Sequence, residues 1–206
     1  MKKFITTLAL TAIIFSQVSA YSSDMLNSAN SLAERGIIND KSGNPVDYNL
    51  DSPVLRQEIS AVARGVAGLP KKDNCDNIFS DVSATTPNTW VCLNVEVLVD
   101  NNLISANTNF RPEDNITKAE SLGMLIKAIG FDYEYNTASS KGWQEQIVDF
   151  AVAKGVIDNF SDYDSDASRG WVFEVANTTI EIEEEEQKQA EIKKEKEAGT
   201  YTDESL

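Results

Sequence analysis

The chain has 206 residues, with 18 Lys and Arg against 33 Asp and Glu, so its formal net charge is −15; it has two Cys and no His. The lack of His excludes Ser-His-Asp catalysis and His-ligated metals, and two Cys are too few for a four-cysteine zinc site. So acidic a chain is unsuited to nucleic acid or to an anionic membrane surface, because both attract proteins through Lys and Arg. A hydrophobic content of 41% predicts a folded core, and the length predicts one domain.

The first twenty residues have the pattern of a secretory signal peptide. Two lysines precede an apolar run over residues 4–15, and Val18-Ser19-Ala20 places small residues where signal peptidase cuts. The run of about 12 residues is too short to span a bilayer core of about 30 Å. We therefore expect cleavage after Ala20, a secreted chain, and no transmembrane segment in the mature protein.

Secretion bears on the two cysteines, Cys75 and Cys92. An oxidising compartment favours a disulfide between them over two free thiols. In the chain-entropy model, closing a loop of this length contributes about 3 kcal/mol. The bridge would tie the segment around Phe79 to a helix that begins near Trp90.

Three segments, residues 32–38, 98–104 and 151–157, share one pattern. Each has two apolar residues, two mostly polar residues, a Gly or Asn, and two aliphatic residues. The Gly or Asn suits the left-handed residue that follows the end of a helix. Apolar residues at i, i+3 and i+4 spacing before it predict a helix in each copy. Trp90 and Trp143 stand 12 residues before that Gly or Asn in the second and third copies, and Asp24 takes the place in the first.

A second helix is predicted after each of these. Residues 48–58 align without a gap on residues 110–120, and both lead into an apolar-periodic run. Thr117 with Glu120 is a helix-capping pattern, and the third copy keeps only Ser168-Arg169 of this motif. Helix–loop–helix units bury their apolar faces only against one another. We expect a signal peptide (1–20), an all-α domain (21–180) with repeats near 24–69, 79–130 and 139–178, and a charged, solvated or partly helical tail (181–206).

The middle copy resembles the S-layer homology (SLH) family, and the other two copies match less well. The residues that carry the resemblance are Phe79-Ser80-Asp81-Val82, Trp90, Leu103-Ile104, Phe110-Arg111-Pro112 and Ile116-Thr117-Lys118-Ala119-Glu120. The resemblance implies three repeats in a pseudo-threefold bundle. It also implies non-covalent attachment to a cell-wall polysaccharide, often a pyruvylated one.

A cation opens each predicted second helix, at Arg56, Lys118 and Arg169. Unpaired N–H groups and the helix dipole at that end, together with the cation, would make an anion site on an acidic chain. Arg binds a carboxylate through two parallel hydrogen bonds whereas Lys offers a point charge, so we expect the Lys118 site to be weaker. Trp90 and Trp143 would wall a groove or stack on a sugar. The alternatives are core tryptophans and solvated first-turn cations.

Asp162, Asp164 and Asp166 have the spacing that opens a calcium loop. Position six is Ala167 and position twelve is Phe173, where such a loop has Gly and Glu, so a solvated acidic loop is the favoured interpretation. We expect no cofactor, and no enzymatic activity because no nucleophile or base stands out.

These observations predict a secreted, non-catalytic binding module of the cell envelope. Its partner would be a cell-wall polysaccharide or a peptidoglycan-linked polymer with anionic groups, and nucleic acid is not expected. The alternative is an exported adaptor that binds a protein partner in the envelope or S-layer and keeps the repeats as a scaffold.

Overall fold

The computed structural model describes residues 23–39, 48–131 and 133–198; the expected signal peptide lies outside these residues. The described residues form six α-helices and no strands, apart from isolated β-bridges, which confirms the predicted all-α fold. The helices are α1 (Ser23–Glu34), α2 (Arg56–Val66), α3 (Val91–Asp100), α4 (Lys118–Ala128), α5 (Trp143–Ala153) and α6 (Arg169–Ala198).

The first helix of each repeat ends as the sequence predicts. Gly36, Asn102 and Gly155 have φ angles of +71°, +59° and +76°. The backbone N–H of the following residue donates to the carbonyl five residues earlier, as in Leu103 to Leu98 at 2.8 Å. This Schellman arrangement satisfies the last carbonyls of the helix and turns the aliphatic pair back onto it.

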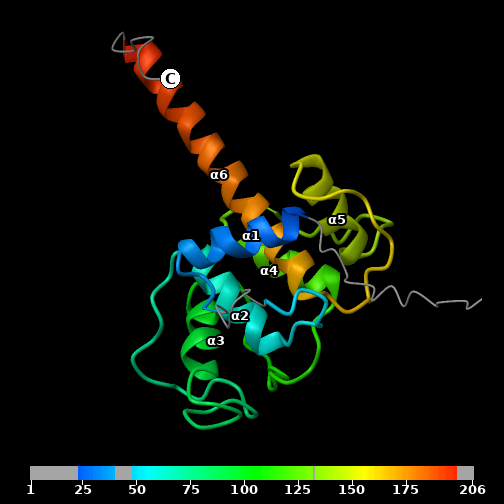
Figure 1. Cartoon of the computed structure of the whole chain (residues 1–206). Helices are drawn as coiled ribbons and strands as arrows, with labels where there is room; N and C mark the ends of the chain where they lie inside the picture. Colours follow the sequence, from blue (N-terminus) through cyan, green and yellow to red (C-terminus); the bar gives the residue numbers. More distant parts are fainter. Residues whose placement is uncertain (1–22, 40–47, 132, 199–206) are drawn as a thin grey trace, which may run out of the picture.

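The three repeats form a closed ring with three-fold character. Figure 1 shows α3 and α5 on opposite sides of the molecule and α6 projecting from it. The second helices α2, α4 and α6 contact one another at the centre, and each also packs on the first helix of the following repeat. Thus α2 packs on α3, α4 on α5, and α6 returns to α1. The contact faces are apolar and fully buried, with Ile59, Leu122 and Val172 among them. Closing the ring buries all three repeats in one core.

Backbone hydrogen bonds join the three repeats just before the central helices begin. The Val54 N–H donates to Ala167, the Ala167 N–H to Ile116, and the Ile116 N–H to Val54, each at 2.9 Å. All three residues are buried, and water cannot compete for these bonds. The cycle fixes where α2, α4 and α6 start relative to one another.

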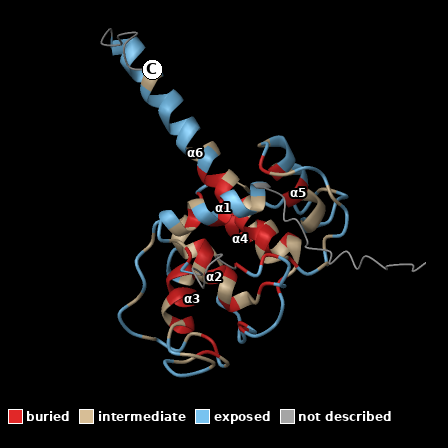
Figure 2. Ribbon diagram, viewed as in Figure 1, coloured by how far each residue is buried: buried red, intermediate tan, exposed pale blue. Residues whose placement is uncertain are grey.

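Helix α6 continues beyond the ring through the charged segment, and residues 181–198 all belong to it (Figure 2). Its base is buried as far as Ile180, and the projecting part is mostly exposed. Arg35 binds Glu184 through both guanidinium nitrogens at 2.6 and 3.0 Å. Lys154 contacts Glu186 at 2.9 Å, so α1 and the end of α5 both hold the helix where it leaves the core. Among the described residues, no helix has both the length and the apolar character needed to cross a bilayer.

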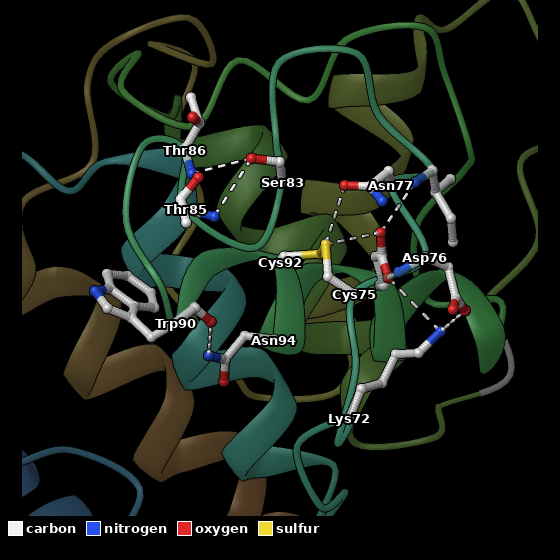
Figure 3. The surroundings of a disulfide bond; sticks show 12 residues. Lys72, Cys75, Asp76, Asn77, Ser83, Thr85, Thr86, Trp90, Cys92 and Asn94 are labelled. Carbon is white, nitrogen blue, oxygen red and sulfur yellow. Dashed lines mark hydrogen bonds and ion pairs between the residues drawn. A yellow bond between two sulfur atoms is a disulfide. The ribbon is translucent and has the colours of Figure 1, made fainter.

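Cys75 and Cys92 form a disulfide with a Cα–Cα distance of 5.7 Å, which confirms the predicted pair (Figure 3). The bond attaches the long loop before α3 to the first turn of that helix. Beside it lies Glu96, whose carboxylate is fully buried and accepts from the N–H groups of Asp76 (2.7 Å) and Ile78 (2.9 Å). The loop is therefore held covalently and by a buried charge.

Candidate functional site

The three sequence-predicted cations occupy equivalent places in the ring. Arg56, Lys118 and Arg169 are the first residues of α2, α4 and α6, and each reaches toward the loop of the following repeat. One cation thus stands at each of the three interfaces between repeats. The side chains are mostly buried but not enclosed, with 14% of each arginine and 24% of the lysine exposed.

The two arginines make matching contacts. Arg56 donates from Nε to the carbonyl of Phe110 (2.8 Å) and from Nη1 to Glu120 (3.1 Å). Arg169 donates from Nε to the carbonyl of Tyr48 (2.9 Å) and from Nη1 to Glu58 (3.0 Å). Both guanidinium groups are therefore fixed in orientation before any ligand arrives.

The guanidinium groups of Arg56 and Arg169 are partly removed from water, because only 14% of each side chain is exposed. Burial lowers the pKa of the Arg169 guanidinium, because desolvation disfavours the charged form. Arginine nevertheless stays protonated in proteins, so the group remains a cation. Each guanidinium also lies 5.2 Å from an aromatic centroid, Phe110 for Arg56 and Phe173 for Arg169. These rings provide part of the solvation that water does not.

Glu58 and Glu120 have two tasks each. Each caps its own helix, with the Leu55 N–H donating to Glu58 (2.8 Å) and the Thr117 N–H to Glu120 (3.2 Å). Each also pairs with the arginine of the preceding repeat in the ring. They are therefore capping and ion-pair residues, as the sequence pattern favoured.

The Lys118 interface is built differently. Lys118 contacts Asp162 at 2.6 Å and lies over the ring of Phe160. This contact lowers the pKa of the Asp162 carboxyl. In the repeat register, Trp171 stands where Glu58 and Glu120 stand in the other copies, and it packs edge-on against Phe160 at 5.9 Å. The third interface therefore lacks the arginine–glutamate pair.

The helix N–H groups are engaged, which corrects the expectation that they are unpaired. The N–H groups of Arg56 and Gln57 donate to the carbonyls of Asp114 (2.9 Å) and Pro112 (3.0 Å). The same contacts recur as Lys118 to Ser165, Ala119 to Tyr163, Arg169 to Ser52 and Gly170 to Leu50. A loop from the neighbouring repeat covers each helix start, so an anion would be recognised by side chains rather than by backbone donors.

A cavity of about 600 Å³ lies beside Arg169, and we call it the Arg169 groove. Its wall combines the arginine and its partner Glu58 with the indole of Trp90 and with the aliphatic pair that follows the C-terminal end of α1. Its lining includes Ile37, Ile38, Glu58, Arg64, Lys71, Trp90 and Arg169. A volume of this size is typical of small-molecule sites.

A second cavity of about 230 Å³ lies beside Arg56, and we call it the Arg56 groove. It includes Glu120 and the indole of Trp143, together with Ile104 and Phe110. In the repeat register Arg56, Glu120, Trp143 and Ile104 correspond to Arg169, Glu58, Trp90 and Ile38 of the Arg169 groove. The two grooves are thus one arrangement built twice.

The structure brings each predicted tryptophan to a groove. Trp90 is half-buried and packs partly on the core, whereas the side chain of Trp143 is 41% exposed. Neither is fully enclosed, and both line a cavity that contains an arginine. Asp24 stands at the corresponding position of the third interface, so no indole from the first copy reaches Lys118.

The three predicted calcium-loop aspartates have separate partners. Asp162 contacts Lys118, Asp164 accepts from Gln144 (3.1 Å), and Asp166 accepts from Asn115 (2.7 Å). Lys118 and Asn115 belong to the second repeat, whereas Gln144 lies on α5 in the same repeat as Asp164. Two of the three carboxylates therefore serve contacts between repeats in the described structure.

Two groove residues escaped the sequence analysis, Arg64 and Lys71. Both lie outside the motif that repeats, so the comparison of copies did not single them out. The alignment of the copies could have identified them, because the equivalent residues of the second copy, Ile126 and Tyr133, have no charge. The two cations are therefore specific to the first copy.

Comparison with known proteins agrees with this architecture. Residues 78–120 match the S-layer homology domain. The chain is also 23% identical over 147 residues to the Middle cell wall protein of Brevibacillus brevis, in an alignment covering 68% of this chain and 13% of that protein. The chain therefore corresponds to a small part of the length of this relative. The resemblance to the S-layer homology family, predicted from the middle copy, is confirmed.

Proposed function

We propose that the protein is a non-catalytic module of the cell envelope that attaches non-covalently to an anionic cell-wall polysaccharide. The observation that carries the proposal is the repetition of one groove, in which an oriented arginine and an indole line the same cavity. A guanidinium recognises a carboxylate by paired hydrogen bonds, and an indole face packs on the apolar face of a sugar ring. Because the chain has a net charge of −15, most of its surface would repel an acidic polymer, and the arginine grooves are the positions that would attract one.

The match to the S-layer homology domain and the similarity to a protein named for the cell wall support this location. A repeating polymer also suits a protein with two equivalent grooves. When one groove is occupied, the next sugar unit reaches the second groove at a high effective concentration. Weak individual contacts then give firm attachment without a covalent bond.

The Lys118 interface contributes less in this proposal. Its cation is a lysine already paired with Asp162, and Asp24 stands at the position where the other two interfaces have Trp90 and Trp143. We therefore assign the binding to the Arg56 and Arg169 grooves, with Trp143 and Trp90 as their aromatic walls.

The test is retention of the mature protein on purified cell-wall polymer. We expect the wild-type chain to be retained and the double variant Arg56→Ala/Arg169→Ala to be released. The control variant Lys127→Ala/Lys141→Ala removes the same charge from exposed positions outside both grooves and should still be retained. Far-UV circular dichroism must show that all variants are folded.

A second variant separates charge from geometry. Arg56→Lys/Arg169→Lys keeps both cations but loses the planar fork, so binding should weaken markedly while the net charge is unchanged. Retention that is the same for all variants would contradict the site assignment. Failure of the folded wild-type chain to bind any wall polymer would favour the protein-binding adaptor.

A further inference from the structure

The two grooves differ in charge although they share one plan. The Arg169 groove is lined by three cations, Arg64, Lys71 and Arg169, against one acid, Glu58, which leaves 3 − 1 = +2. The Arg56 groove is lined by one cation and one acid, so its charge is 1 − 1 = 0. Because the chain as a whole has a charge of −15, a cavity with two surplus positive charges is a local exception.

The added cations are held in place by the fold. Arg64 donates from Nε to Asn94 (2.7 Å) and from Nη1 to the carbonyl of Leu69. Asn94 in turn donates to the carbonyl of Trp90 at 2.6 Å, as Figure 3 shows. The guanidinium is thus tied, through one buried amide, to the residue whose indole walls the groove. Arg64 therefore lines the cavity in a fixed position.

Lys71 is held by its backbone and not by its side chain. The N–H of the next residue, Lys72, donates to the carbonyl of Leu93 in the first turn of α3 at 3.1 Å. This bond places the segment alongside α3, whose N-cap residue is Trp90. The Lys71 side chain is exposed and lines the cavity. A flexible ammonium at the rim suits an anionic group that lies farther along a bound chain.

We propose that the Arg169 groove takes a saccharide segment that carries two negatively charged groups, one facing Arg169 and the other facing Lys71 and Arg64. The Arg56 groove takes a segment with one such group. This inference rests on the proposed function and makes the two grooves unequal. The larger volume, about 600 Å³ against about 230 Å³, agrees with a longer segment in the Arg169 groove.

The experiment compares galacturonic acid, which has one carboxylate, with its α-1,4-linked dimer, which has two. Two-dimensional NMR of the mature protein follows the indole N–H signals of Trp90 and Trp143, which report the two grooves separately. At the Trp90 signal, the dimer should bind about tenfold more tightly than the monomer, because a second charge pair forms in a partly screened site. At the Trp143 signal, the ratio should stay near two.

The variant Lys71→Gln should reduce the dimer-to-monomer ratio at Trp90 to about two and leave Trp143 unchanged. Lys127→Gln removes the same charge from an exposed position on α4 and should leave both ratios unchanged. Equal ratios at the two indoles, no response to the dimer, or identical behaviour of the two lysine variants would each overturn the proposal. Retention on wall polymer tests the proposed function separately, so the two failures are distinguishable.

Discussion

Replacing Glu96 with glutamine should destabilise the protein by about 2–4 kcal/mol. The carboxylate is fully buried and accepts two backbone N–H groups, from Asp76 and Ile78. An amide of the same shape has one oxygen, so one N–H keeps an acceptor and the other faces an NH₂ group. Losing the charge from the first bond costs about 1 kcal/mol, and leaving a buried donor unpaired costs about 1–3 kcal/mol.

Lys72 does not increase this loss. Its ammonium lies 3.7 Å from Glu96 but also contacts Asp76 (2.5 Å) and Asp100 (2.8 Å), so it keeps two partners in the variant. Those contacts raise the pKa of Lys72, first through the hydrogen bond to Asp100. The ammonium therefore stays charged at neutral pH, and the local charge balance is otherwise preserved.

The measurement is urea unfolding followed by far-UV circular dichroism with the disulfide intact. The matched control, Glu113→Gln, removes the same charge from an exposed loop and should change the free energy of unfolding by less than about 0.5 kcal/mol. If Glu96→Gln were as stable as the control, the buried carboxylate would not be what holds the loop before α3.

The remaining predictions concern packing, pH and the projecting helix. Gly170→Ala should lower the free energy of unfolding by about 1–3 kcal/mol, because the added Cβ would lie 3.2 Å from the carbonyl oxygen of Leu50. Gly123→Ala should raise it by about 0.5–1 kcal/mol, because no atom lies within 4 Å of the added Cβ. Urea unfolding measures both variants. Burial raises the pKa of Glu174 above the ordinary value of 4.5, so the free energy of unfolding of the wild type falls as pH rises through the raised pKa. Glu174→Gln should therefore be more stable than the wild type at pH 7. This advantage should disappear below pH 4.5, where Glu174 is protonated in both the folded and the unfolded protein. Arg35→Gln should lower the free energy of unfolding by less than about 1 kcal/mol, because the Arg35–Glu184 ion pair is exposed. Amide hydrogen exchange around Glu184 should nevertheless become faster. Unchanged exchange would show that this ion pair does not hold α6 where it leaves the core.

Local patterns gave reliable predictions where backbone chemistry leaves few choices. Gly36 and Gly155 could be assigned as helix ends because few other residues adopt a positive φ cheaply, and the structure gives them +71° and +76°. Thr117 with Glu120 could be assigned as a helix start for a similar reason, since the two side chains satisfy backbone donors reciprocally.

The contacts between repeats could not be predicted from the sequence. The partners of Arg56 and Arg169 lie more than 50 residues away along the chain, and only the closing of the ring brings them together. The same closing supplies the carbonyls that occupy the helix N–H groups, which a single repeat viewed alone leaves unpaired. Lys71 reaches the Arg169 groove through the loop after α2, whose path no periodic pattern records, and the Leu69 carbonyl in that loop orients Arg64 on the helix.

The arrangement of the ring also has a consequence for how the molecule opens. In the described residues, α1 packs on α6 alone among the helices, α3 on α2 alone, and α5 on α4 alone. Each outer helix can thus detach singly while the inner three stay together, which makes it a separate unit of local unfolding. The disulfide latches only α3. Thermal fluctuations should accordingly release α5, which no disulfide holds, more often than α3.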